Sequence, residues 1–146
     1  MDKLKKEFVE WKITKPDYIH QMYLEHKKLF VYSEFIKNTD IKKIEIEDGR
    51  VIITSRDLEI KLICEENDER IAPIEILNFD YYEKDESQMM YDLIEDGFTI
   101  FDIGANIGWY SIGITKAKNN IKIFAFEPIL KTYKNLLANI VNIVFS

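Results

Sequence analysis

Residues 98–128 read FTIFDIGANIGWYSIGITKAKNNIKIFAFEP, and this stretch decides the fold of the C-terminal part of the chain. It opens with an almost wholly apolar segment, passes through a glycine-bearing turn, continues with apolar residues at helical spacing, and closes with a second apolar segment. This order predicts a strand, a helix and a second strand parallel to the first. In open α/β sheets, the turn after such a first strand is where nucleotide-like ligands bind.

The turn between the first strand and the helix has the residue types that a ligand site needs. Asp102 stands at the end of the strand, and Gly104 and Gly108 follow it. Because glycine has no Cβ, the backbone can bend sharply at these positions and a ligand can approach the peptide groups. A helix that starts near Ile107 directs its free N–H groups and its partial positive charge toward the same crevice.

The spacing of the turn favours one class of ligand over another. Ala105 and Asn106 stand where the dinucleotide fingerprint GxGxxG has its middle glycine, which disfavours a pyrophosphate and a nicotinamide-dependent enzyme. The carboxylate of Asp102 favours a ligand that carries a positive ammonium or sulfonium group. Glu127, at the end of the second strand, can accept hydrogen bonds from both hydroxyls of a ribose.

Three sequence motifs resemble the FkbM family of S-adenosylmethionine-dependent methyltransferases. They are FDIGANIGWYS at 101–111, FAFEP at 124–128 and FDYYEKDE at 79–86. The resemblance extends over residues 79–146 and implies a Rossmann-like domain with a seven-stranded, mostly parallel sheet. It also implies methyl transfer from S-adenosylmethionine, usually to an oxygen of a sugar or secondary metabolite, so that the partner would be a small-molecule or glycan acceptor.

The same resemblance implies roles for particular residues. The turn motif would hold the methionine and sugar parts of the cofactor, Glu127 would bind the ribose, and the segment with Tyr82 and Glu83 would approach the cofactor. The residues so assigned to cofactor binding are Tyr82, Glu83, Asp102, Gly104, Ala105, Asn106, Gly108 and Glu127. Trp109 fits either a place in the pocket or packing beneath the helix.

No catalytic base and no metal site can be assigned from the sequence. His20 and His26 are the two histidines, and on a helix they point to different faces without an acidic partner fixed by spacing. A lone Cys64, expected as a small buried residue in a strand, excludes an internal disulfide and a cysteine-rich metal cluster. The residue that would remove the proton from a hydroxyl acceptor therefore remains unknown.

The N-terminal part of the chain predicts helices and then a hairpin. Residues 1–11 form an amphipathic segment. After Pro16, apolar residues recur every three or four positions, which predicts a helix to about Asn38. The aromatic side chains of this helix are expected to pack in a core. Alternating apolar residues on both sides of Asp48-Gly49 predict a β-hairpin.

Three further elements are expected between the hairpin and the central stretch. Residues 58–64 predict a third strand, and 71–79 predict another, which Pro73 restricts to an edge or an end. A helix is expected from Asp85, which would cap it together with Gln88 in an arrangement like a capping box.

The expected fold class is α/β: N-terminal helices and a β-hairpin region over 1–78, followed over 79–146 by the first part of a Rossmann-like methyltransferase sheet. A third parallel strand is expected at 143–145, while the later strands of the family's sheet have no counterpart in the sequence. We therefore expect an N-terminal portion of such an enzyme, which alone would bind cofactor weakly or not at all. The alternative is a non-catalytic interaction module or an inactive fragment that retains only the cofactor motif.

Composition excludes several other classes of protein. The chain has 146 residues, with 20 Lys and Arg against 26 Asp and Glu, so its net charge of −6 gives no electrostatic footprint for nucleic acid. No apolar run approaches the length of a membrane span or of a signal peptide's core, which predicts a cytoplasmic protein. An uncovered edge of the expected sheet would allow oligomerisation.

Overall fold

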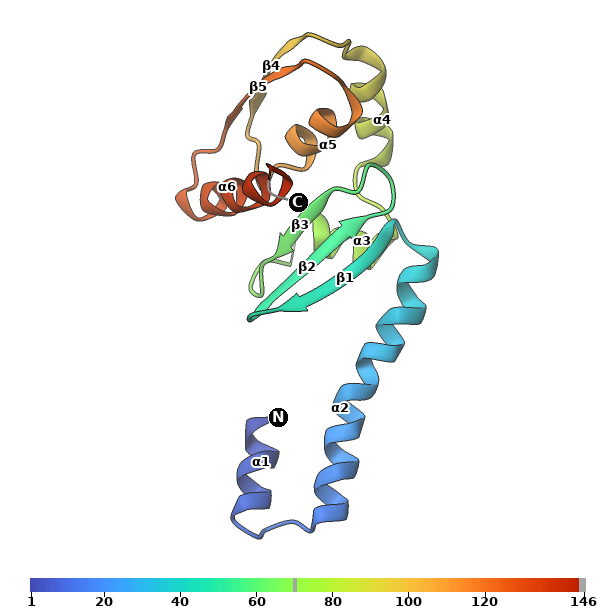
Figure 1. The fold of residues 1–146 in the computed structure, drawn as a ribbon, viewed down its shortest axis with the longest axis vertical. Helices are drawn as coiled ribbons and strands as arrows, with labels where there is room; N and C mark the ends of the chain where they lie inside the picture. The colour runs from blue at the N-terminus through green and yellow to red at the C-terminus, as the bar shows by residue number, and fades with distance from the viewer. Residues whose placement is uncertain (70, 145–146) are drawn as a thin grey trace. The chain divides into compact units, whose positions relative to one another are not determined.

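The computed structural model describes residues 1–69 and 71–144, which form a mixed α/β structure with one antiparallel and one parallel sheet (Figure 1). The chain divides into two compact units, Met1–Lys37 and Asn38–Ser146. The division at residue 78 that the sequence predicts falls inside the second unit and stays a prediction. Within the described residues, no helix combines the length and the apolar character that crossing a membrane requires.

The first unit is a pair of helices, α1 (Asp2–Val9) and α2 (Lys15–Phe35), as the sequence predicts. Thr14 caps α2, since its hydroxyl oxygen accepts the N–H of Asp17 at 3.3 Å. Proline in the first turn costs no hydrogen bond, because the first four N–H groups of a helix have no partner within it. The short 3-10 helix η1 (Ile36–Asn38) follows.

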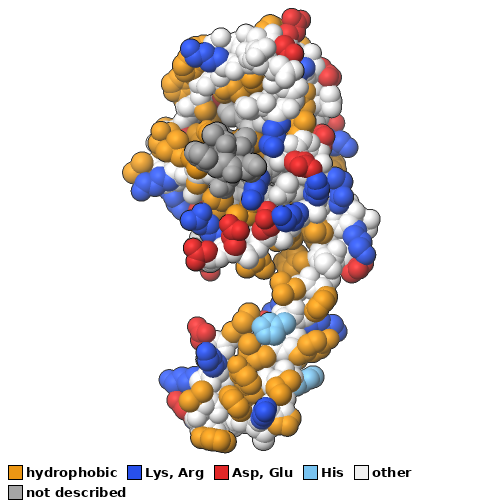
Figure 2. All heavy atoms as spheres, in the orientation of Figure 1, with side chains coloured by type: hydrophobic (Ala, Val, Ile, Leu, Met, Phe, Trp, Pro, Cys, Tyr) orange, Lys and Arg blue, Asp and Glu red, His pale blue; other side chains and the backbone are white. Residues whose placement is uncertain are grey.

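The aromatic side chains of α2 are not packed in a core, so this prediction is wrong. No residue of the helix is buried, and Tyr23, Phe30 and Tyr32 are exposed. Figure 2 shows hydrophobic side chains at the surface of this unit. The physical reason is that apolar residues occur around the whole circumference of α2, whereas α1 is too short to cover them. One aromatic contact between the two helices is the stacking of Phe8 on Tyr18, with ring centroids 4.7 Å apart.

The second unit begins with an antiparallel sheet of β1 (Ile41–Glu47), β2 (Arg50–Ser55) and β3 (Lys61–Cys64), in that order. The predicted hairpin is therefore confirmed. The third strand, predicted over 58–64, is confirmed for 61–64 only, because Leu58 and Glu59 form a turn with positive φ angles. Asp48 and Gly49 both have positive φ angles, which is the geometry of a two-residue hairpin turn.

Residues 72–79 form a helix, α3 (Ala72–Phe79), so the predicted strand at 71–79 is wrong. Pro73 sits in the first turn, where a missing N–H costs nothing, after Ile71 in extended conformation. Ala72, Pro73 and Ile76 are buried, so the apolar residues follow a helical period rather than an alternating one.

The next helix, α4 (Lys84–Leu93), starts one residue before the predicted cap. Its N-cap position is Glu83, with a left-handed φ of 40°, while Asp85 lies in the first turn. Gln88 donates to Asp92 at 2.9 Å instead of closing a capping box. The predicted helix is confirmed. The prediction that Asp85 caps it is wrong, because Glu83 occupies the N-cap position in a left-handed conformation and Asp85 already belongs to the helix.

The central stretch has the predicted order of elements: β4 (Thr99–Ile103), α5 (Trp109–Ala117) and β5 (Lys122–Phe126). The strands are parallel, with Asp102 opposite Ala125 and Ile103 opposite Phe126. Helix α5 lies on one side of these strands (Figure 1). This confirms the strand–helix–strand unit, which in the described residues has two parallel strands and no third.

Helix α6 (Leu130–Val144) follows β5 directly. The predicted third strand at 143–145 is therefore wrong for Ile143 and Val144, and Phe145 lies outside the described residues. The reason is that no glycine or proline interrupts residues 130–144, and their apolar residues recur at threes and fours.

The core of the second unit joins the two sheets through α3, α5 and α6. Its fully buried side chains include Ile41, Ile53, Leu62, Ile76, Ile107, Ile112, Ile114 and Leu136. Asn139 of α6 is a polar residue of this core, with no exposed area. Its Oδ1 accepts the N–H of Ile63 at 3.0 Å, and its Nδ2 donates to the carbonyl of Ile107 at 2.9 Å. One side chain thus connects β3, the glycine turn and α6.

Candidate functional site

The candidate site forms where both parallel strands end. Because Ile103 pairs with Phe126, Gly104 and Glu127 follow at the same edge of the sheet. The N–H groups of Gly104 and Ala105 both donate to the carbonyl of Phe126, each at 2.9 Å. These two bonds hold the glycine turn against the end of β5, and therefore beside Glu127.

The carboxylate of Glu127 is fixed by one backbone hydrogen bond at each oxygen. Oε2 accepts the N–H of Asn106 at 3.0 Å, and Oε1 accepts the N–H of Ile129 at 2.8 Å. A carboxylate offers about four acceptor positions, so among the described residues each oxygen keeps a position for a further donor. Two adjacent hydroxyls, as on a ribose, match this pair of positions.

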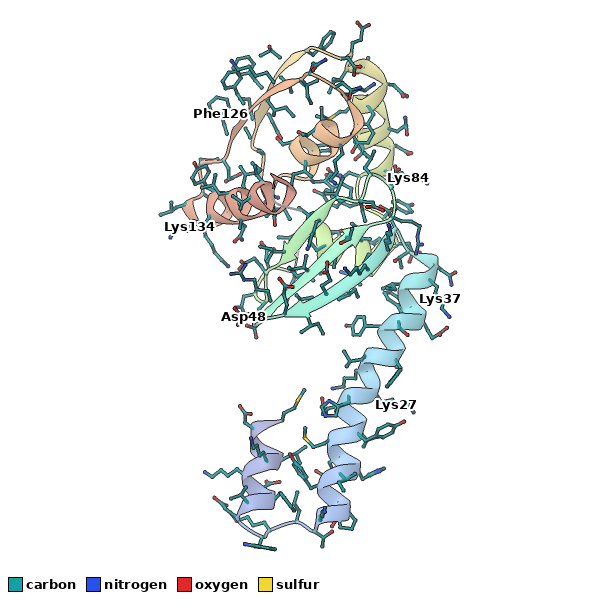
Figure 3. All side chains as sticks on the ribbon, viewed as in Figure 1. Lys27, Lys37, Asp48, Lys84, Phe126 and Lys134 are labelled. Atoms are coloured by element: carbon teal, nitrogen blue, oxygen red, sulfur yellow. The ribbon has the colours of Figure 1, made fainter. Side chains whose placement is uncertain are left out.

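A cavity of about 600 Å³ lies beside this edge. It is lined by Ile103, Gly104, Ala125, Phe126, Glu127, Pro128 and Tyr133. Glu127 supplies the charge in this lining, and the rest is mainly apolar, which is the usual composition of a small-molecule site. Phe126 lies on the side of the sheet opposite α5 (Figure 3).

The two glycines of the motif do different things. Gly104 has a φ of +84°, and a Cβ there would meet no atom within 4 Å, so its peptide is open to a ligand. Gly108 has a φ of +97°, and a Cβ there would lie 2.8 Å from Cδ1 of Leu136. Gly104 therefore serves the cavity, whereas Gly108 serves the packing of α6 against the start of α5.

Replacing Gly108 by alanine is expected to destabilise the chain by about 1–3 kcal/mol from the left-handed backbone alone, with the contact to Leu136 adding to this cost. Gly97→Ala is the matched control, because Gly97 also has a φ of +84° but open space where the Cβ would be. Urea unfolding of both variants measures the difference. Equal stability of the two variants would contradict the packing role of Gly108.

The carboxylate of Asp102 points toward α5 and does not line the cavity. It accepts a hydrogen bond from the hydroxyl of Ser111, at 2.6 Å, and Ser111 is buried in α5. Side chains alternate along a strand, so Asp102 and Ile103 face opposite sides of the sheet. Asp102 thus joins β4 to α5 in this structure, while its neighbour Ile103 contributes to the cavity wall.

The turn amides are already paired. The N–H groups of Gly104, Ala105 and Asn106 donate to Phe126 and Glu127, and Gly108 donates to the carbonyl of Ala105 at 2.8 Å. Ala105 itself is buried. These four amides are therefore not available as a nest for phosphate oxygens, which agrees with the spacing argument against a pyrophosphate.

Tyr82 and Glu83 lie away from the Glu127 cavity, near the first turn of α5. The ring of Tyr82 packs edge-to-face on Trp109, with centroids 5.5 Å apart, and Glu83 accepts the hydroxyl of Tyr110 at 2.5 Å. Burial, together with the charge of Glu83, raises the pKa of Tyr82 to about 12. Tyr82 and Trp109 line a second cavity of about 440 Å³.

The second cavity was not predicted from the sequence. Its lining comes from segments at 38–40, 55–60 and 80–91 together with Trp109, and no local pattern marks residues that meet only through the fold. Among the described residues, no cluster of three His, Cys, Asp or Glu side chains could hold a metal ion. Burial raises the pKa of the half-buried Cys64 to about 11, so its thiol stays protonated near neutral pH.

Comparison of the chain with models of known protein families, with curated proteins and with solved structures gave no match.

Proposed function

We propose that the second unit binds S-adenosylmethionine at the Glu127 cavity, as the cofactor part of a methyltransferase. The observation that carries this proposal is the carboxylate of Glu127, fixed by Asn106 and Ile129 so that each oxygen retains a position for one ribose hydroxyl. Gly104 beside it leaves the backbone open to close approach. The motif resemblance supports the same assignment.

The residues of the cavity fit this cofactor in charge and polarity. A carboxylate in an otherwise apolar lining favours a cationic ligand over an anionic one, and Ile103, Phe126 and Tyr133 supply apolar surface against which the cofactor would pack. When bound, S-adenosylmethionine supplies an electrophilic methyl group on a positive sulfur. The protein's contribution is then to hold the cofactor and align an acceptor, for which we propose a hydroxyl of a sugar or secondary metabolite.

No general base is assigned in this proposal. Glu127 and Tyr133 are the titratable groups of the cavity lining, and the carboxylate is engaged by two backbone N–H groups. His20 and His26 belong to α2 in the first unit. The proposal therefore covers cofactor binding and alignment, and it treats β4 and β5 as the first strands of a Rossmann-like sheet.

Titration with S-adenosylmethionine, followed through backbone amide resonances, tests the proposal. We expect the amides of Gly104, Asn106 and Ile129 to shift, with a dissociation constant on the order of 0.1–1 mM, because few groups hold the ligand. ATP is the control ligand and should bind more weakly, since it has the same ribose but a triphosphate that finds no free turn amides. Unshifted amides at saturating ligand, or tighter binding of ATP, would reject the proposal.

A second candidate function, self-association, is favoured by one exposed face of the parallel sheet. Phe101 lies between Phe124 and Phe126, with ring centroids 5.2 and 6.3 Å away, and all three side chains are exposed. Among the described residues of β4 and β5 on this face, the charged side chain is that of Lys122, which lies over the ring of Phe124, so a second copy of the chain would meet no carboxylate from these strands. Exposed apolar patches of this kind mark interaction sites.

The self-association candidate predicts that Phe124→Ser lowers the apparent mass of the protein at high concentration. Light scattering after size-exclusion chromatography measures this mass. Phe30→Ser on α2 is the control, because Phe30 is also an exposed phenylalanine but lies outside the parallel sheet. A wild-type chain that stays monomeric at all concentrations would exclude the candidate.

A further inference from the structure

The second cavity is built from side chains that the methyltransferase proposal does not use. Its volume of about 440 Å³ is within the range of small-molecule sites, about 300–1,000 Å³. The lining combines aromatic rings with both hydrogen-bond donors and acceptors. Its members include Asp40, Arg56, Tyr81, Lys84, Gln88 and Trp109.

The aromatic part of the lining is held in place before any ligand arrives. Trp109 is only 8% exposed, and its Nε1 donates to the hydroxyl of the buried Ser87 at 3.1 Å. Tyr82 packs against Trp109, and Tyr91 is half-buried. Tyr81 is 56% exposed and stands at the open side. Rings fixed in this way lose little conformational entropy when a ligand stacks on them.

The charged part of the lining sets three carboxylates, Asp40, Asp57 and Asp80, against the cations Arg56 and Lys84. Arg56 donates through Nη2 to the carbonyl of Ile41 at 3.0 Å and through Nε to that of Thr39 at 3.4 Å. Burial raises the pKa of Asp40, and the positive charges of Arg56 and Lys84 oppose this shift. Lys84 lies at the start of α4 (Figure 3). Because the lining carries one more carboxylate than it has cations, the cavity favours an uncharged polar ligand over an anion.

We propose that this cavity binds an uncharged, hydroxyl-rich ring compound of monosaccharide size. Hydroxyls can both donate and accept, which matches a lining that mixes carboxylates, a lysine and an amide, and the apolar face of such a ring packs on tyrosine and tryptophan. The site is separate from the Glu127 cavity. The inference is therefore independent of whether the chain binds S-adenosylmethionine.

The test is a titration with methyl α-D-glucopyranoside in the absence of any cofactor. The chain has two tryptophans, and their indole N–H resonances report on different places: Trp109 lines the cavity, whereas Trp11 is 90% exposed in the first unit. We expect the Trp109 signal to shift with a dissociation constant on the order of 1–10 mM while the Trp11 signal stays fixed.

Two variants and one further ligand make the result decisive. Tyr81→Ala should weaken binding about tenfold, whereas Tyr23→Ala, which removes a tyrosine of similar exposure (53%) from α2, should leave it unchanged. Glucose 6-phosphate should bind no better than the neutral glycoside. The proposal is overturned by a fixed Trp109 signal, by equal binding to both tyrosine variants, or by a preference for the phosphate.

Discussion

Asn139→Leu is expected to lower the free energy of unfolding by about 2–4 kcal/mol, although leucine has the same branched arrangement of side-chain heavy atoms as asparagine. The side chain has no exposed area and bonds both the N–H of Ile63 and the carbonyl of Ile107. Leucine would leave both backbone groups without a partner in the core. Each such buried group costs about 1–3 kcal/mol, because it loses its hydrogen bonds to water on folding and gains no hydrogen-bond partner in the core.

Urea unfolding followed by circular dichroism measures this loss, and hydrogen exchange at the Ile63 amide locates it. Asn135→Leu on the same helix is the matched control, because Asn135 is only half-buried. We expect the control to change stability by less than about 0.5 kcal/mol. If both variants unfold at the same urea concentration, Asn139 does not connect β3 and the glycine turn in the way described.

The second large effect is expected at Glu127, whose replacement by alanine should weaken S-adenosylmethionine binding at least tenfold. Two hydrogen bonds from ribose hydroxyls to a carboxylate would be lost, each contributing about 1.5–3 kcal/mol. The substitution also removes the acceptor for the N–H groups of Asn106 and Ile129, so the turn itself would loosen. A loss of affinity alone therefore does not separate binding from structure.

A change in the ligand separates these two roles of Glu127. S-adenosylhomocysteine and its 2′-deoxy counterpart should differ in affinity for the wild-type chain about tenfold, and this difference should vanish in Glu127→Ala. Calorimetry or amide shifts give the four dissociation constants, one for each ligand with each form of the chain. If the difference persists in the variant, the ribose is bound elsewhere. If affinity survives the combination of Asp102→Ala with Glu127→Ala, the methyltransferase assignment of this stretch is wrong.

The elements that the sequence predicts correctly are those with a complete local signal. The hairpin has alternating apolar residues on both sides of Asp48-Gly49, and the β4–α5–β5 unit changes its period at a glycine turn. Residues 71–79 are apolar almost throughout, so periodicity alone does not distinguish a strand from α3. Pro73 does not distinguish them either, because proline is compatible both with an edge strand and with the first turn of a helix.

The candidate site was predictable in part for a similar reason. Gly104 and Glu127 each follow a parallel strand, so topology alone brings them together. The direction of Asp102 toward Ser111 depends on which face α5 covers, and the place of Tyr82 depends on its contact with Trp109. The second cavity draws on segments more than fifty residues apart in the chain, and such proximity arises from packing rather than from any local pattern.

The different surroundings of the two motif glycines have a consequence for how such sequences should diverge. A copy that no longer needs a ligand loses the selection on Gly104, where asparagine can adopt the positive φ and the space for a side chain is open. Gly108 would still be required, because Leu136 occupies the space beside it. Among descendants of one gene, drift at position 104 with glycine retained at 108 should therefore identify those that have stopped binding a ligand but continue to fold.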